Sequence, residues 1–134
     1  AATSLVNSLR MLRLQKAVLA TGMFSLFEAL LQDKYGWEYP YSSLDQKLRE
    51  LGRTDLADPI KDYNLSINVL KYGTGRSHAE LMARKETLPF RISVPGHAFD
   101  EGDVSEIGIL IDVDDRFVRR CAELIDQATA IIGT

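Results

Sequence analysis

The residues best suited to chemistry lie in the segment Arg76-Ser77-His78, which directly follows Gly73-Thr74-Gly75. Ser77 and Glu80 have the spacing of a capping box, and this spacing predicts a helix that begins at His78. An arginine and a histidine would then stand beside free backbone N–H groups at the start of that helix. Such an arrangement is suited to holding an anion such as a phosphate.

This segment supplies two sets of candidate site residues. His78 and Arg76 form the candidate catalytic pair, in which the arginine would hold the phosphate. The candidate phosphate-binding residues are Lys71, Gly75, Arg76 and Ser77. The alternative is a purely structural junction, because connections between helices often have this glycine-rich pattern, and we favour that alternative.

Other kinds of chemistry find little support in the sequence. Cys121 is the only cysteine, so no internal disulfide can form, and its place on the apolar face of a predicted helix indicates a buried side chain. Two acidic groups, at residues 100–103 and 112–115, lack the spacing of a calcium loop. We therefore predict no metal site and no cofactor.

Composition and charge are those of one soluble domain. The 134 residues carry 16 basic and 19 acidic side chains, a net charge of -3, so no overall positive field attracts nucleic acid. Contact with RNA is possible only as a local feature. We recognise neither a signal peptide nor a membrane span, and together with the single cysteine this predicts a cytoplasmic protein that binds no membrane.

A long first helix is the main element that would position the candidate site. From Ser4 to about Lys34 the chain has no proline and one glycine, and its apolar residues recur every three or four positions, which predicts a helix about 45 Å long. These apolar residues are Leu5, Leu9, Leu12, Leu19, Met23, Leu26 and Leu30. The spacing slips at Lys16, and we recognise no heptad register.

Past Lys16 the same helix gains a second apolar side. Its residues are Val18, Phe24, Phe27 and Leu31. A helix that is apolar on more sides than a small bundle can cover must lie at the centre of the bundle or contact another subunit, so we predict self-association. We also predict one common core that contains Leu26, Phe27, Leu30, Ile67, Leu70, Leu124 and Ala128.

The middle of the chain predicts an aromatic loop followed by two helices. The loop, Tyr35-Gly36-Trp37-Glu38-Tyr39-Pro40-Tyr41, is expected to cap the open end of the bundle with its large rings. A short helix starts at Ser43 and is ended by Gly52. The next helix starts at Asp58-Pro59, since proline is favoured at the first helical position.

In the last third of the chain, the spacing of apolar residues changes from that of a helix to that of a strand, and a final helix follows. Between Phe90 and Val113 apolar and polar residues alternate, which predicts a small two-stranded element. Asp114 then caps a final helix. The predicted fold is mainly α: a single domain over residues 1–134, built as a helical bundle around the long first helix, with the β element before the last helix.

These elements together resemble the HEPN domains of prokaryotic toxin and defence systems. The resemblance is carried by the first helix with Gly22-Met23-Phe24-Ser25-Leu26-Phe27-Glu28-Ala29, a short middle helix, an asparagine-containing helix that ends at Lys71-Tyr72-Gly73, and a closing helix. Active members are metal-independent RNases with an arginine, four to six residues, then a histidine, and two copies meet across a dimer. Arg91 and His97 have that spacing here, whereas Arg76 and His78 lie where the resemblance places the functional helix junction.

Two functions therefore stay open. We favour a non-catalytic interaction or oligomerisation domain of HEPN-like helical type, which binds a copy of itself or another protein. The alternative is a divergent HEPN-like, metal-independent endoribonuclease or RNA-phosphate-binding protein that uses Arg76 and His78.

Overall fold

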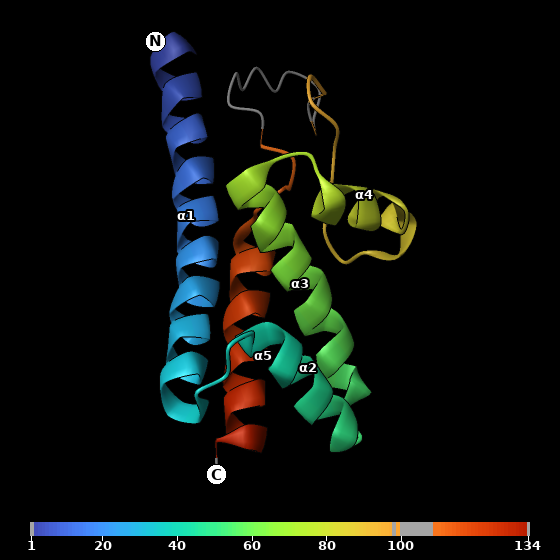
Figure 1. Ribbon diagram of the computed structural model, residues 1–134. Coiled ribbons are helices and arrows are strands. Elements are labelled where there is room, and N and C mark those ends of the chain that lie inside the picture. The colour runs from blue at the N-terminus through green and yellow to red at the C-terminus, as the bar shows by residue number, and fades with distance from the viewer. Residues whose placement is uncertain (1, 98, 100–108, 134) are drawn as a thin grey trace.

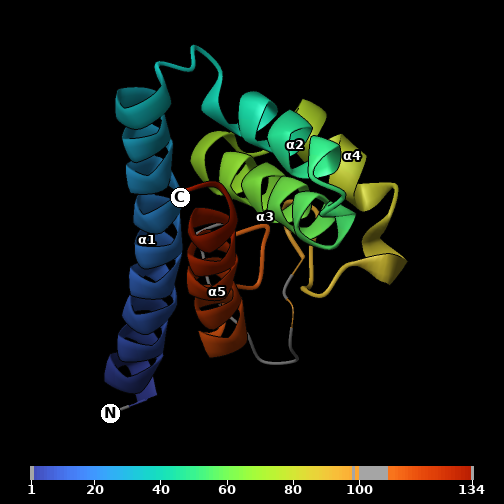
Figure 2. The ribbon, with the colours of Figure 1, turned by 90° about the horizontal axis from the view of Figure 1, so that it is seen from below.

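A computed structural model describes residues 2–97, 99 and 109–133 and confirms a mainly helical bundle around a long first helix (Figure 1). Its elements are α1 (Ala2–Tyr35), α2 (Pro40–Glu50), α3 (Thr54–Tyr72), α4 (Arg76–Met82), the short 3-10 helix η1 (Lys85–Thr87) and α5 (Asp115–Ile132). α3 packs against each of the other four α-helices. Figure 2 shows α1 and α5 side by side, with α2 and α3 lying across one side of this pair.

α1 and α5 run in the same direction. Lys16 in the middle of α1 lies 3.2 Å from Asp115 at the start of α5, measured from Nζ to Oδ1. At the other end the Tyr35 hydroxyl donates to the Ile132 carbonyl at 2.9 Å, and the Lys34 ammonium donates to the Gly133 carbonyl at 3.0 Å. The second half of α1 is thus tied along the full length of α5.

Only one of the two apolar sides of α1 is buried by this packing. The buried residues are Ala17, Ala20, Phe24, Phe27 and Leu31. Their spacing of three and four residues keeps them on one side of the helix. The two alanines let neighbouring helices approach closely, and the two phenylalanines then fill the space where the helices diverge.

The predicted common core is therefore wrong in two of its members. Leu26 and Leu30 are 69% and 65% exposed, because they lie on the other apolar side of α1. Phe27 is buried as expected. Ile67, Leu124 and Ala128 are buried as well, and Leu70 is partly buried against them.

The aromatic residues predicted as a loop pack at one end of α1, but the loop itself is shorter than predicted, because Tyr35 belongs to α1 and Tyr41 to α2. Tyr35 stacks on Trp37 with 4.6 Å between ring centroids. Tyr41 stacks on Phe24 at 5.6 Å and donates its hydroxyl proton to the Phe24 carbonyl. Burial, with a smaller contribution from the nearby Glu28 carboxylate, raises the pKa of Tyr41 above its usual range.

Two helix starts differ from the predicted ones. α2 begins at Pro40, three residues before Ser43, which agrees with the preference of proline for a first helical position. α3 begins at Thr54 rather than at Asp58-Pro59, because the Arg53 carbonyl already accepts the N–H groups of Leu56 and Ala57. Pro59 consequently lies inside the helix.

The predicted two-stranded element is reduced to one antiparallel bridge in the described part of the chain. Ile92 and Ile111 form the bridge, and both are buried. The Ser93 N–H donates to the Leu110 carbonyl at 2.8 Å, and the Asp112 N–H donates to the Arg91 carbonyl at 3.0 Å. The predicted second strand began at residue 107, and residues 107 and 108 lie outside the described residues.

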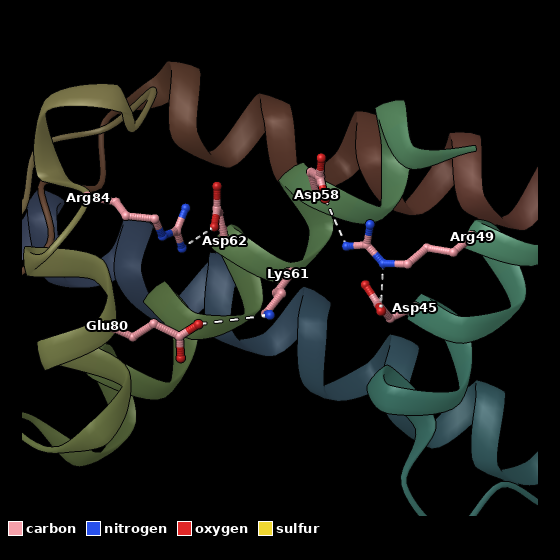
Figure 3. A network of polar contacts seen from close by, with 7 residues as sticks. All are labelled: Asp45, Arg49, Asp58, Lys61, Asp62, Glu80 and Arg84. Carbon is pink, nitrogen blue, oxygen red and sulfur yellow. Dashed lines mark hydrogen bonds and ion pairs between the residues drawn. The ribbon is translucent and has the colours of Figure 1, made fainter. Parts of the chain in front are cut away.

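A row of exposed ion pairs joins α2, α3 and α4 (Figure 3). Arg49 on α2 contacts Asp58 on α3 at 2.8 Å, and Arg84, which follows α4, contacts Asp62 on α3 at 2.6 Å. Lys61 and Glu80 add a longer contact of 3.9 Å between α3 and α4. Exposed pairs of this kind each contribute only about 0 to 1 kcal/mol, so the buried apolar contacts hold the bundle together.

Replacing Phe27 tests which side of α1 is buried. Phe27→Ala should lower the free energy of unfolding by about 3 to 5 kcal/mol, since it removes a buried ring and leaves a cavity. Leu26→Ala, one residue away on the exposed side, is the control and should change stability by no more than about 0.5 kcal/mol. Urea unfolding at low protein concentration measures both, and equal losses would contradict this assignment of the two sides.

Candidate functional site

The predicted break between two helices lies where the sequence places it. α3 ends at Tyr72, and Gly73 caps it with φ of 75° while its N–H donates to the Val69 carbonyl at 2.8 Å. This left-handed conformation favours glycine, which has no Cβ to clash with the backbone. The glycine turn therefore sets the direction in which α4 leaves α3.

The capping box predicted at Ser77 and Glu80 does not form. α4 begins at Arg76, two residues earlier than expected, with Gly75 before it and no side-chain cap. Glu80 lies toward Lys61 on α3 instead of turning back to Ser77 (Figure 3). Contact with a neighbouring helix has thus replaced the local hydrogen bond that the spacing favours.

His78 has a structural partner. Its side chain is 8% exposed, and its Nε2 atom lies 2.7 Å from the Ser93 carbonyl oxygen. A carbonyl can only accept, so Nε2 carries the proton and donates it. The ring thereby fastens α4 to the extended segment around residue 93, which fits the structural interpretation of the junction.

The other candidate residues of the junction lie apart from His78. Arg76 is exposed and contacts no described residue through its guanidinium. Lys71 turns toward the Tyr72 ring, with 5.6 Å from Nζ to the centroid, and borders a cavity of about 300 Å³ whose lining includes neither Arg76 nor His78. The structure therefore does not bring Lys71, Arg76 and His78 together in one described cavity.

Arg91 and His97, which have the arginine-to-histidine spacing of the RNase resemblance, lie in a segment that is not helical. Arg91 donates from Nε and Nη2 to one carboxylate oxygen of Asp112, at 3.0 and 2.6 Å. Its guanidinium also lies over the Phe99 ring, 5.4 Å from the centroid. His97 is exposed.

A larger cavity lies between α3, α5 and the segment that begins at Pro89. Its volume is about 500 Å³. The basic residues on its wall are Arg91, Arg116, Arg119 and Arg120, the acidic ones are Asp112, Asp114 and Glu123, and Tyr63, Phe90 and Phe117 add aromatic rings. We did not predict this site. The signal available was the three arginines of the final helix at 116, 119 and 120, whose spacing places them on one side.

The aromatic residues of this cavity pack against one another. Tyr63 lies 5.2 Å from Phe90 and 4.8 Å from Phe117 between ring centroids, and Phe90 lies 5.3 Å from Phe117. These contacts join α3, the bridged segment and α5, so the wall of the cavity is part of the core. The packed core thus fixes the backbone positions from which the arginines of the cavity project.

Tyr63 also offers an unused polar group at this wall. The residue is 3% exposed and lines the cavity, and its hydroxyl makes no hydrogen bond with the described residues. Burial raises the pKa of Tyr63 to about 12, so the phenol stays protonated and can donate. The hydroxyl oxygen is not among the buried unpaired atoms of the described residues, so it is accessible from the cavity and can donate to a bound acceptor.

No metal centre is found in the described residues: they contain no group of three or more His, Cys, Asp or Glu side chains that could hold an ion. Asp100, Glu101 and Asp103 of the first acidic group lie outside the described residues. Cys121 is fully buried on α5, and burial raises the pKa of its thiol to about 12.

Comparisons with known proteins give no relative for this chain. No family model matches it, and neither the curated proteins nor the solved structures include a match. Any functional assignment therefore rests on the geometry described above.

Cys121 gives a simple test of the core. With a thiol pKa of about 12, only about one molecule in ten thousand carries a thiolate at pH 8. The folded protein should therefore react with a thiol reagent at least about 100-fold more slowly than the urea-unfolded protein. Rapid labelling without denaturant would show that Cys121 is accessible.

Substitutions at the junction test the structural role of His78. His78→Ala should cost about 1 to 3 kcal/mol, since it leaves the Ser93 carbonyl without its donor. Arg76→Ala and Ser77→Ala should each change stability by less than about 0.5 kcal/mol, because neither side chain caps α4. Chemical denaturation measures the stability of all three variants. A loss of stability in Ser77→Ala as large as that in His78→Ala would show that Ser77 does cap the helix.

Proposed function

We propose that the protein is a non-catalytic self-association domain of HEPN-like helical type, with α1 as the interface between two copies. The observation that carries the proposal is a row of exposed leucines on α1, which we call the leucine stripe. Each of them is at least half exposed, from 50% to 69%: Leu5, Leu9, Leu12, Leu19, Leu26 and Leu30. A row of this length on a soluble protein is typical of an interaction surface.

The leucine stripe follows a heptad register. Positions 5, 9, 12, 16, 19, 23, 26 and 30 are separated alternately by four and three residues, which is the spacing of the contact positions in a coiled coil. Lys16 and Met23 occupy the two positions that are not leucine. Lys16 keeps its place in the repeat, so our expectation that no heptad register is present was wrong.

Lys16 is accommodated within the chain itself. Its ammonium lies 3.2 Å from the Asp115 carboxylate at the start of α5. The charged end is thereby drawn to the edge of the leucine stripe while the methylene groups stay beside the leucines. A single lysine at a contact position lowers the stability of a coiled coil but helps to fix its register and oligomeric state.

A second copy fits this surface in extent and in pattern. Together with Met11 and Val18, which are also exposed, the leucine stripe presents on the order of 800 Å², about the area that one partner buries in a stable interface. A copy of α1 offers the same repeat, so its leucines can pack into the spaces between those of the first. Burial of apolar area then drives association.

A membrane is the other apolar environment to consider. α1 is long and apolar enough to cross one by length and composition, although a core helix or a signal sequence meets the same test. Its Phe24 and Phe27 are buried in the bundle, Lys16 interrupts the leucine stripe, and Glu28 is exposed beside the buried side, four positions after Phe24. These features favour a protein partner over lipid, and with the single cysteine they fit a cytoplasmic protein.

Leu19→Glu tests the proposal at the centre of the leucine stripe. It should weaken self-association by at least about 100-fold, since it places a carboxylate among the leucines of the interface. Gln32→Glu adds the same charge at an exposed position of α1 outside the stripe and should leave association unchanged. Sedimentation equilibrium measures the dissociation constants of both variants and of the parent.

Three results would contradict the proposal. The parent protein could remain a monomer at high micromolar concentration, or Leu19→Glu could associate as tightly as Gln32→Glu. Flotation of the parent with neutral lipid vesicles, lost in Leu19→Glu, would assign the leucine stripe to a membrane instead.

The endoribonuclease alternative has its own test. The hydrogen bond between His78 and the Ser93 carbonyl favours the non-catalytic function, so we expect no cleavage of single-stranded RNA in the presence of a metal chelator. Cleavage by the parent that disappears in His78→Ala, with folding retained, would establish the alternative.

A further inference from the structure

The large cavity beside α5 has an excess of unpaired positive charge. Of its four arginines, Arg91 contacts Asp112, and Arg120 contacts Glu123 at 3.4 Å. The third carboxylate, Asp114, accepts the Phe117 N–H at 2.9 Å as the cap of α5. Every acidic side chain of the wall therefore already has a partner.

The other two arginines of the cavity wall are Arg116 and Arg119. Both are exposed, both line the cavity, and neither makes an ion pair or a hydrogen bond with the described residues. They stand three positions apart on α5, on the same side of the helix. Each guanidinium offers a planar set of N–H donors that matches the oxygens of a phosphate or a carboxylate.

A third donor comes from the wall of the cavity. The Tyr63 hydroxyl lines the same space, belongs to a residue that is 97% buried, and has no hydrogen-bond partner among the described residues. Among the described residues, the two arginine side chains and the Tyr63 hydroxyl are donors without an acceptor. An oxyanion would supply the acceptors for all three.

We propose that this cavity binds a small organic phosphate through Arg116, Arg119 and Tyr63. The volume of about 500 Å³ lies in the usual range for small-molecule sites and exceeds what a bare phosphate fills. The rings of Phe90 and Phe117 supply an apolar wall for the remainder of the ligand. The proposal is independent of self-association, because no residue of α1 lines the cavity.

Titration of the full chain with three probes tests the proposal. Adenosine monophosphate, inorganic phosphate and adenosine are each added while amide chemical shifts are followed by NMR. The monophosphate should bind, with shifts centred on the first turns of α5, and adenosine should bind at least about tenfold more weakly, since it lacks the anion. If inorganic phosphate binds as tightly as the monophosphate, the ligand is the free anion. That result would support the anion site and overturn the claim that the ligand carries an organic group.

Three variant proteins test which side chains donate to the bound phosphate. Arg116→Ala combined with Arg119→Ala should weaken binding of the monophosphate by at least about tenfold. Tyr63→Phe keeps the buried ring and removes only the hydroxyl, so it should weaken binding about three- to tenfold while the fold is retained. Arg76→Ala removes an exposed arginine that does not line the cavity and should bind as the parent does.

Two outcomes would overturn the proposal. One is the absence of binding by the parent at millimolar concentrations of the monophosphate and of inorganic phosphate. The other is a double arginine variant whose affinity equals that of Arg76→Ala, since the bound anion would then lie elsewhere. If folded Tyr63→Phe protein binds with unchanged affinity, the Tyr63 hydroxyl does not donate to the ligand, and this part of the proposal is wrong.

Discussion

The parallel packing of α1 against α5 is the contact on which the other features of this protein depend. It is fixed at one end by Lys16 and Asp115 and at the other by the hydrogen bond from Tyr35 to the Ile132 carbonyl. Between these ends small buried residues, among them Ala20 on α1 and Cys121 on α5, allow close approach. This contact sets the rotation of α1 about its own axis, and with it the choice of the side that faces outward.

That rotation explains why the core could be predicted only in part. Local signals were sufficient for the existence of the helices, because the periodicity of α1, the glycine after α3 and the cap at Asp114 act within a few residues. The two apolar sides of α1 are equally apolar in sequence, and nothing local says which one α5 will cover. Leu26 and Phe27 are neighbours in the chain and have opposite environments for that reason.

The candidate sites show the same division between local and distant effects. The junction before α4 was found from sequence because it is local, but its capping box failed once Glu80 met Lys61 from another helix. The cavity beside α5 was missed since its walls come from three separate segments. Sequence alone also cannot show that Arg91 is paired with Asp112 whereas Arg116 has no partner within the described part of the chain. Partner assignment depends on the fold.

The distance along the chain between α1 and α5 has a consequence for synthesis. α5 begins 80 positions after α1 ends, so a ribosome must make most of the domain before α5 can cover its part of the buried side of α1. Tyr41 of α2, by contrast, can pack on Phe24 and Phe27 early in synthesis. Until then the part of α1 that α5 covers stays exposed beside the leucine stripe and can contact another nascent chain. Association through the leucine stripe, as proposed above, therefore requires that α5 packs on α1 before a second copy does.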